Sequence, residues 1–319
     1  MDVFPVFYQV ILLVIMIFVG FIAGKSRILG DHGDDIIAKL VFNITLPCLL
    51  LTSITGMNMT PEMWRNAIGV MALTVIIHGI QMGVGFASSK ALRLSESKSV
   101  IHIIHSFKGN TIFIGFPLID ALFPGGEGLL YAALYNLTSN IIMWTIGVMI
   151  LDKSKKKSVW CNLSKLVNLN TVALLIGLAL LIINVDFPDF IKGSVGTIGK
   201  ATSPLAMIFI GLKFANTHIR EIVKDTSAWV FSFNKLIFMP LIAGVVVFLL
   251  NSQGIIEISA TARMCVLIQA STPGFAMMII ISKIYNADTN TAVRNFFLST
   301  WWSILTLPLM YYLLSLLFF

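Results

Sequence analysis

Long apolar stretches divide the chain into ten segments, each of a length that can cross a membrane. A bilayer core requires about 20 predominantly apolar residues in a helix. In the first half of the chain such stretches occur near residues 7–24, 36–56, 66–87, 99–123 and 128–151. In the second half they occur near residues 167–185, 192–215, 226–250, 258–284 and 291–318. The pattern therefore predicts an all-α polytopic membrane protein with ten transmembrane helices, which we number helices 1–10 in chain order.

Prolines recur at nearly the same offset in the two halves of the chain. Pro47 and Pro204, in helices 2 and 7, are 157 residues apart, and Pro117 and Pro273, in helices 4 and 9, are 156 residues apart. Because each half holds five helices, the second half enters the membrane in the opposite orientation, which is the pattern of an inverted-topology repeat. We therefore expect a first repeat over residues 1–152, a short basic cytoplasmic linker over residues 153–166 and a second repeat over residues 167–319.

Composition and charge support a membrane protein and argue against a soluble one. Apolar residues make up 57% of the chain and charged residues 12%, whereas an ordinary soluble domain has about 25% charged residues. The net charge of +7 arises from short basic clusters between apolar stretches, so we expect no nucleic-acid partner. Most Lys and Arg residues follow odd-numbered helices, which places these loops in the cytoplasm and both termini outside. The first apolar stretch lacks a basic n-region and is interpreted as helix 1 of a cytoplasmic-membrane protein.

Helices 4 and 9 contain glycine, proline and polar residues at the depth of the bilayer centre. Proline removes a backbone donor and clashes with the preceding turn, so each helix is expected to break there into two half-helices. We expect Pro117 in the first turn of the second half of helix 4, and Thr272 capping a half-helix that begins at Pro273. Two half-helix N-termini that meet near the midplane would attract an anion, whereas the alternative is that the prolines only kink packed helices. The candidate substrate-binding residues are Lys108, Asn110, Thr111, Gly115, Pro117, Gln269, Ser271, Thr272, Pro273 and Gly274.

Lys108 is a basic residue within a predicted span and carries a cost of at least about 2.5–3.5 kcal/mol if it stays charged there. His102, His105 and Lys108 recur every three residues and share one helical face. One interpretation is an anion path with a titratable entrance. The alternative places both histidines near the cytoplasmic interface, with Lys108 extending toward it.

Other polar residues of the spans have weaker assignments. Asn43 in helix 2 corresponds to Lys200 in helix 7 by the 157-residue offset, and we include Asn43 among the candidate substrate-binding residues. His78 is interpreted as a packing residue, and Asn136 and Asn140 as interhelical hydrogen-bonding residues.

Catalytic and metal-binding patterns are missing from the sequence. Carboxylates are almost absent from the spans, no HExxH or Gly-x-Ser-x-Gly motif occurs, and the three cysteines lack metal-ligand spacing. We therefore expect that the protein is not an enzyme and that it binds neither a metal ion nor a cofactor.

Motifs along most of the chain resemble those of a known family. The stretch from Gly109-Asn110-Thr111 to Gly115-Phe116-Pro117-Leu118 is similar to the helix 4 motif of the auxin efflux carrier family, which includes plant PIN carriers and bacterial malate and malonate permeases. Pro273 with Lys283-Ile284-Tyr285-Asn286 resembles helix 9 and its exit, and Thr306-Leu307-Pro308 resembles helix 10. The absence of a long insert between helices 5 and 6 is typical of a prokaryotic member.

This resemblance implies an elevator-type secondary transporter of small organic anions such as malate, malonate or other carboxylates. It implies a scaffold of helices 1, 2, 6 and 7 that forms a homodimer, and a transport domain of helices 3–5 and 8–10. Broken helices 4 and 9 would cross at the substrate site, where Asn110 would contact the substrate. Two alternatives stay open, namely a sodium-coupled bile-acid-type symporter and an exporter of auxin-like aromatic acids.

Overall fold

The computed structural model describes residues 4–30, 32–55, 57, 59–151, 168–183, 185, 187–215 and 222–318. This part of the chain is helical and contains no β-strand apart from one isolated bridge. Six of its helices are long and apolar enough to cross a membrane: Gly33–Ile54, Pro61–Ala91, Glu127–Leu151, Asp189–Ala215, Thr226–Ser252 and Thr289–Leu317. Shorter apolar helices lie at the predicted helices 1, 4, 6 and 9: Ile11–Lys25, Thr111–Leu122, Leu169–Ile182 and Ala260–Ala270.

These helices confirm the all-α membrane class. The number of ten crossings and the inverted repeat stay predictions. The predicted linker over residues 153–166 lies outside the described residues.

The chain divides into two compact units. Unit 1 consists of Met1–Arg65, Ile112–Ala133 and Val167–Thr217, and unit 2 consists of Asn66–Thr111, Leu134–Leu166 and His218–Phe319. Both units are therefore assembled from segments of both halves of the chain.

Unit 1 is built on close approaches between helices at small residues. Its elements are α1 (Phe4–Lys25), α2 (Gly33–Leu40), η1 (Val41–Thr45), α3 (Leu46–Ile54), α6 (Phe116–Leu122), α10 (Leu169–Ile182), α11 (Asp189–Lys200) and α12 (Thr202–Ala215). Gly20 of α1 and Gly211 of α12 face the backbone of the opposite helix so closely that a Cβ at either glycine would overlap it. Small residues at such crossings are typical of helices that pack in a membrane. Lys213 of α12 also pairs with Asp34 of α2 at 2.5 Å.

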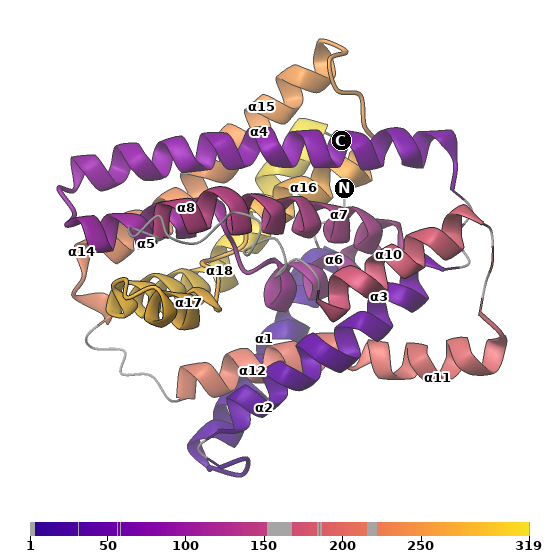
Figure 1. The fold of residues 1–319 in the computed structure, drawn as a ribbon, viewed down its shortest axis with the longest axis horizontal. Coiled ribbons are helices and arrows are strands. Elements are labelled where there is room, and N and C mark those ends of the chain that lie inside the picture. The colour runs from indigo at the N-terminus through magenta and orange to yellow at the C-terminus, as the bar shows by residue number, and fades with distance from the viewer. Residues whose placement is uncertain are drawn as a thin grey trace. The chain divides into compact units, whose positions relative to one another are not determined.

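Unit 2 packs around a core of apolar side chains. Its elements are most of α4 (Pro61–Ala91), α5 (Glu96–Phe107), the end of α7 (Glu127–Ile142), η3 (Met143–Gly147), α8 (Val148–Leu151), α14 (Thr226–Phe233), η5 (Asn234–Phe238), α15 (Met239–Ser252), α16 (Ala260–Ala270), α17 (Met278–Ile284) and α18 (Thr289–Phe318). Figure 1 shows α4 as one long uninterrupted helix. Phe107, at the end of α5, packs in a buried cluster with Met143 of η3 and Met278 of α17.

Four π-helical segments interrupt the described helices. They are η1, η3, η5 and η2 (Thr111–Gly115). Three of them directly precede an α-helix that has proline in its first turn, namely Pro47 after η1, Pro117 after η2 and Pro240 after η5. Because proline cannot donate a backbone hydrogen bond and its ring crowds the preceding turn, the wider π turn accommodates the ring without ending the helix.

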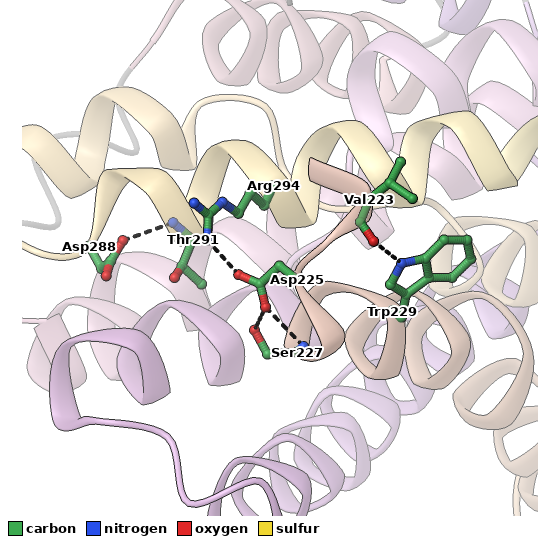
Figure 2. A network of polar contacts seen from close by, with 7 residues as sticks. All are labelled: Val223, Asp225, Ser227, Trp229, Asp288, Thr291 and Arg294. Carbon is green, nitrogen blue, oxygen red and sulfur yellow. Dashed lines mark hydrogen bonds and ion pairs between the residues drawn. The ribbon is translucent and has the colours of Figure 1, made fainter. Parts of the chain in front are cut away.

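The start of α14 is fixed to α18 by a small polar network (Figure 2). Asp225 caps α14 by accepting hydrogen bonds from the backbone N–H and the hydroxyl of Ser227, at 2.9 and 2.6 Å. Its other carboxylate oxygen pairs with Arg294 of α18 at 2.7 Å. The Trp229 indole donates to the Val223 carbonyl at 2.8 Å, and Asp288 caps α18 through the Thr291 N–H.

Candidate functional site

Helix 4 is interrupted where the sequence predicts a break. α5 ends at Phe107, and Lys108 has extended backbone angles, φ −98° and ψ 107°. The helix resumes at Thr111 with η2 and continues into α6 through Gly115, which has helical backbone angles. Pro117 therefore lies in the second turn of this half-helix and not in its first turn, so that prediction is wrong. The Lys108 N–H makes the last hydrogen bond of α5, to the Ile104 carbonyl at 2.8 Å, and the N–H of Asn110 is not used by a helix.

Helix 9 is also interrupted, but the predicted cap is wrong. α16 ends at Ala270 and α17 begins only at Met278, so Pro273 is not a first helical residue. The Thr272 hydroxyl donates to the Gln269 carbonyl at 2.7 Å and thus terminates α16 instead of capping the next helix. The helix Thr111–Leu122 begins directly after Asn110, whereas α17 begins several residues after Pro273, so neither Pro117 nor Pro273 marks a half-helix N-terminus beside residues 108–110.

The two interrupted segments pair with each other inside unit 2. Gly109 and Gly274 form an isolated antiparallel bridge, and the Asn110 N–H donates to the Pro273 carbonyl at 2.7 Å. The Gly274 N–H is satisfied by the Ser299 hydroxyl of α18 at 3.0 Å. A Cβ at Gly109 would overlap Thr272, so glycine is required for this approach. We refer to residues 108–110 with 271–274 as the paired break.

Lys108 points into the interior of unit 2 and not toward an interface. The residue is 1% exposed, and its ammonium donates to the Ser139 hydroxyl at 2.9 Å and to Asn140 Oδ1 at 2.8 Å. The ammonium also lies 5.2 Å from the ring centroid of Phe275. One turn before Asn140, Asn136 accepts a hydrogen bond from the Thr111 hydroxyl at 2.8 Å. Asn140 thus holds the paired break to α7, and Asn136 holds Thr111, the residue directly after it.

A second buried lysine, Lys235 of η5, was not among the predicted site residues. Its ammonium donates to the Ser106 carbonyl at 3.0 Å, in the last turn of α5. Its place inside the apolar stretch 226–250 is a signal that sequence reasoning could have used, because intramembrane lysines mark functional sites. Lys108 and Lys235 are fully buried, and no Asp or Glu is buried among the described residues.

Three histidines share the interior of unit 2 with these lysines. His102 Nε2 lies 2.7 Å from the Ser88 hydroxyl, His105 Nε2 lies 3.2 Å from the Phe275 carbonyl, and His78 Nε2 lies 2.9 Å from the Ser139 hydroxyl. All three are buried. The interior of unit 2 is therefore rich in basic groups.

Two buried amides near the paired break have no hydrogen-bonding partner among the described residues. They belong to Gln269, at the end of α16, and to Asn295 of α18, and both side chains are 0% exposed. Buried amides without partners are uncommon in proteins and call for an explanation. Gln81 of α4 contributes a further amide that donates to the Ala270 carbonyl at 3.1 Å.

The predicted site residues are distributed over both units. Unit 2 contains those of the paired break with their neighbours: Lys108, Asn110, Thr111, Gln269, Ser271, Thr272, Pro273 and Gly274. Unit 1 contains Gly115 and Pro117, which are buried, and Asn43, which is exposed in η1. In the described part of the chain no group of three or more His, Cys, Asp or Glu residues could hold a metal ion.

Comparison with known proteins identifies the family. A family model described as membrane transport protein matches residues 5–311. The chain is 24% identical over 310 residues to an uncharacterized transporter of Methanocaldococcus jannaschii. The aligned region covers 94% of this chain and 96% of that relative. The chain is also 22% identical over 302 residues to an uncharacterized transporter of Methanothermobacter thermautotrophicus. That alignment covers 94% of this chain and 95% of the relative. Family and relatives are transporters and not enzymes. Since the family model matches nearly the whole chain, the protein belongs to the membrane transport protein family, the auxin efflux carrier family that its motifs resemble.

Proposed function

We propose that this membrane transport protein carries small organic anions, with carboxylates such as malate and malonate as the substrates. The observation that carries the proposal is the paired break, where polar backbone and buried amides lie in the same unit as two buried ammonium groups. Because no Asp or Glu is buried among the described residues, the interior favours a ligand of negative charge.

The donors around the paired break match the chemistry of a carboxylate. Asn110 and Gln269 each offer an amide N–H₂ group. The Thr111 hydroxyl already donates its proton to Asn136 Oδ1 and thus orients the residue next to Asn110. Hydrogen bonds from such donors to a charged acceptor contribute about 1.5–3 kcal/mol each. The Gln269 amide, which has no partner among the described residues, would be satisfied by the ligand.

We propose an elevator motion as the mechanism, in which the substrate moves with one unit. The division into two compact units supports this proposal. Unit 1 gathers helices 1, 2, 6 and 7, whereas unit 2 gathers helices 3, 8, 9 and 10 with the first part of helix 4 and the end of helix 5. Residues 112–133, which the resemblance assigns to the transport domain, cluster with unit 1.

We also propose that the protein forms a homodimer through helices 1, 2, 6 and 7. The dimer would lie in the cytoplasmic membrane, with both termini of each chain outside. Apolar side chains of α1, among them Ile11, Ile15 and Phe18, are more than half exposed in the single chain. A second subunit or lipid would cover them.

A binding screen of the purified protein tests the substrate class. Thermal unfolding is measured with monocarboxylates, dicarboxylates and aromatic acids, with and without sodium and at two pH values, because a ligand stabilises the state that it binds. We expect small carboxylates to raise the Tm without sodium. Stabilisation by bile acids only in sodium, or by aromatic acids only, would support the corresponding alternative instead. Failure of every organic anion would refute the proposal.

Asn110→Ala locates the binding site in the same assay. Loss of a hydrogen bond to a charged ligand should weaken binding by about 10-fold or more. Asn251→Ala is the matched control, because Asn251 holds the turn after α15 through the Ile258 N–H and lies outside the paired break. Unchanged affinity in folded Asn110→Ala would remove Asn110 from the site.

A further inference from the structure

Three polar side chains of unit 2 form a continuous hydrogen-bonded row from the paired break to α4. The Lys108 ammonium lies 2.9 Å from Ser139 Oγ, and Ser139 Oγ lies 2.9 Å from His78 Nε2. The three residues come from the end of α5, from α7 and from α4. All are at most 1% exposed. We propose that Lys108, Ser139 and His78 form a proton relay that couples the binding of an organic anion to the uptake of one proton.

The hydrogen-bond roles in the row follow from the chemistry of each group. An ammonium can only donate, so Ser139 Oγ accepts from Lys108. The single Ser139 proton is then available for His78, and Nε2 accepts it when the ring is neutral with its proton on Nδ1. This arrangement satisfies both contacts of the hydroxyl, whereas a protonated Nε2 would leave the Ser139 proton without this acceptor.

Proton transfer along the row balances bond by bond, with solvent as the final acceptor of the proton. An Nζ–H bond of Lys108 breaks as an Oγ–H bond forms at Ser139, and the original Oγ–H bond breaks as an Nε2–H bond forms at His78. The serine ends as a hydroxyl, Lys108 as a neutral amine and His78 as an imidazolium. One positive charge has moved from the paired break to α4. The imidazolium then loses its proton to solvent, so the protein without ligand holds one proton fewer than the protein with an anion bound.

The surroundings of Lys108 make its charge depend on a ligand. No carboxylate contacts the ammonium, whose neighbours are Ser139, Asn140 and the Phe275 ring. The charged or titratable groups around the row are Lys235 on η5, His105 on α5 and Tyr135 on α7, whose ring centroid lies 5.5 Å from that of His78. None of them is a carboxylate. Like charges oppose one another in a buried site. A bound carboxylate therefore supplies the missing countercharge, and its departure favours release of the proton to Ser139.

Anion and proton are consequently bound together. The inference rests on the proposed function, since it requires an organic anion at the paired break. It adds a coupling ion and makes the transport of a carboxylate responsive to a proton gradient. It also assigns a role to His78, which the sequence alone indicates only as a packing residue.

Calorimetric titration with malonate counts the protons. It is performed on the wild-type protein above about pH 7, where both carboxyls of malonate are ionised, in buffers of different ionisation enthalpy. We expect about one proton taken up per malonate, and a Kd that rises by up to about tenfold per pH unit. Malonate binding without proton uptake overturns the relay and leaves the proposed function intact. Absence of binding by every carboxylate tested overturns the proposed function itself.

Variants of the two lysines identify the group that takes up the proton. Lys108→Gln should remove both the proton uptake and the pH dependence of the Kd, whereas Lys235→Gln should keep them. The opposite pattern overturns the assignment to Lys108. The wild-type proton count stands as a test even where one of these variants fails to fold.

Variants of the other two residues test the path. In proteoliposomes, Ser139→Ala and His78→Gln should lower malonate uptake driven by a proton gradient by about tenfold or more, while the Kd changes by less than about threefold. Thr138→Val is the matched control, because the Thr138 hydroxyl on the same helix donates to the Leu134 carbonyl at 3.0 Å and is not part of the row. Uptake by Ser139→Ala equal to that of the control overturns the relay.

Discussion

Gly109→Ala should destabilise the protein because it separates the two segments of the paired break. An added Cβ would overlap the Thr272 hydroxyl and lie 3.0 Å from the Thr272 carbonyl oxygen. Overpacking of this kind costs about 1–3 kcal/mol. If the hydroxyl moves away, the hydrogen bond to the Gln269 carbonyl is lost as well, at about 0.5–1.5 kcal/mol. We therefore expect the free energy of unfolding to fall by about 1.5–4.5 kcal/mol.

The matched control is Gly83→Ala in α4. Gly83 is exposed, and no atom lies within 4 Å of an added Cβ. Within a helix, alanine is more stable than glycine by about 0.5–1 kcal/mol. The same chemical change should thus have opposite signs at the two positions. Unfolding by sodium dodecyl sulfate in mixed micelles, followed by tryptophan fluorescence, measures both.

A second background makes the test specific to Thr272. Thr272→Ala removes the hydroxyl that the new Cβ would meet, so Gly109→Ala should cost less in this background than in the wild type. An equal cost in both backgrounds, or a Gly109→Ala protein as stable as the wild type, would refute the reasoning. It would mean that the two segments are not held against each other at this glycine.

Three further predictions concern charge. Lys108→Gln should raise the Kd for a dicarboxylate more than for a monocarboxylate in calorimetric titration, because the second carboxylate needs its own countercharge; equal effects on both acids would remove Lys108 from the site. Partial burial raises the pKa of Asp225, but hydrogen bonds from Ser227 and Arg294 lower it further, so the net pKa lies below the ordinary carboxyl value of 3.8. The charged Asp225 therefore stabilises the fold above that pH and ceases to do so as the pH falls through the lowered pKa; Asp225→Asn, which keeps a capping side chain, should be less stable than the wild type at neutral pH and approach it in acid, and a constant difference would contradict this. In a cysteine-free background, a membrane-impermeant thiol reagent should label Gln253→Cys from outside intact cells but not Ser95→Cys, and the reverse pattern would invert the predicted topology.

Local chemistry explains which parts of the site could be predicted. Glycine and proline act on the backbone where they stand, so the interruptions of helices 4 and 9 are visible in the sequence. The cap assigned to Thr272 was wrong because its hydroxyl has two possible partners, the helix before it and the helix after it. The structure shows that it bonds backward, to Gln269. Sequence pattern alone does not distinguish these partners.

Contacts between distant residues explain what could not be predicted. Ser139 lies 31 residues from Lys108 and 61 residues from His78 in the sequence, so no helical periodicity relates the three. The grouping of Gly115 and Pro117 with unit 1 likewise depends on tertiary contacts. Lys235 is a different case, because a lysine within an apolar stretch can be recognised from the sequence. Its hydrogen-bonding partner, the Ser106 carbonyl, is known only from the structure.

The π-helical segments have a consequence for how the chain tolerates changes in length. Each segment holds its extra residue within a turn, so the deletion of one residue from η2 or η5 can be absorbed by conversion to a regular α-helix. Because the wide turn already holds the extra residue, such a deletion keeps the later side chains of that helix on the faces that they occupy now. It also returns Pro117 or Pro240 to a regular turn, in which its ring meets the carbonyl four residues earlier. Among relatives, a one-residue alignment gap at these positions is therefore expected to coincide with loss of the adjacent proline, while the same residues continue to face the interior.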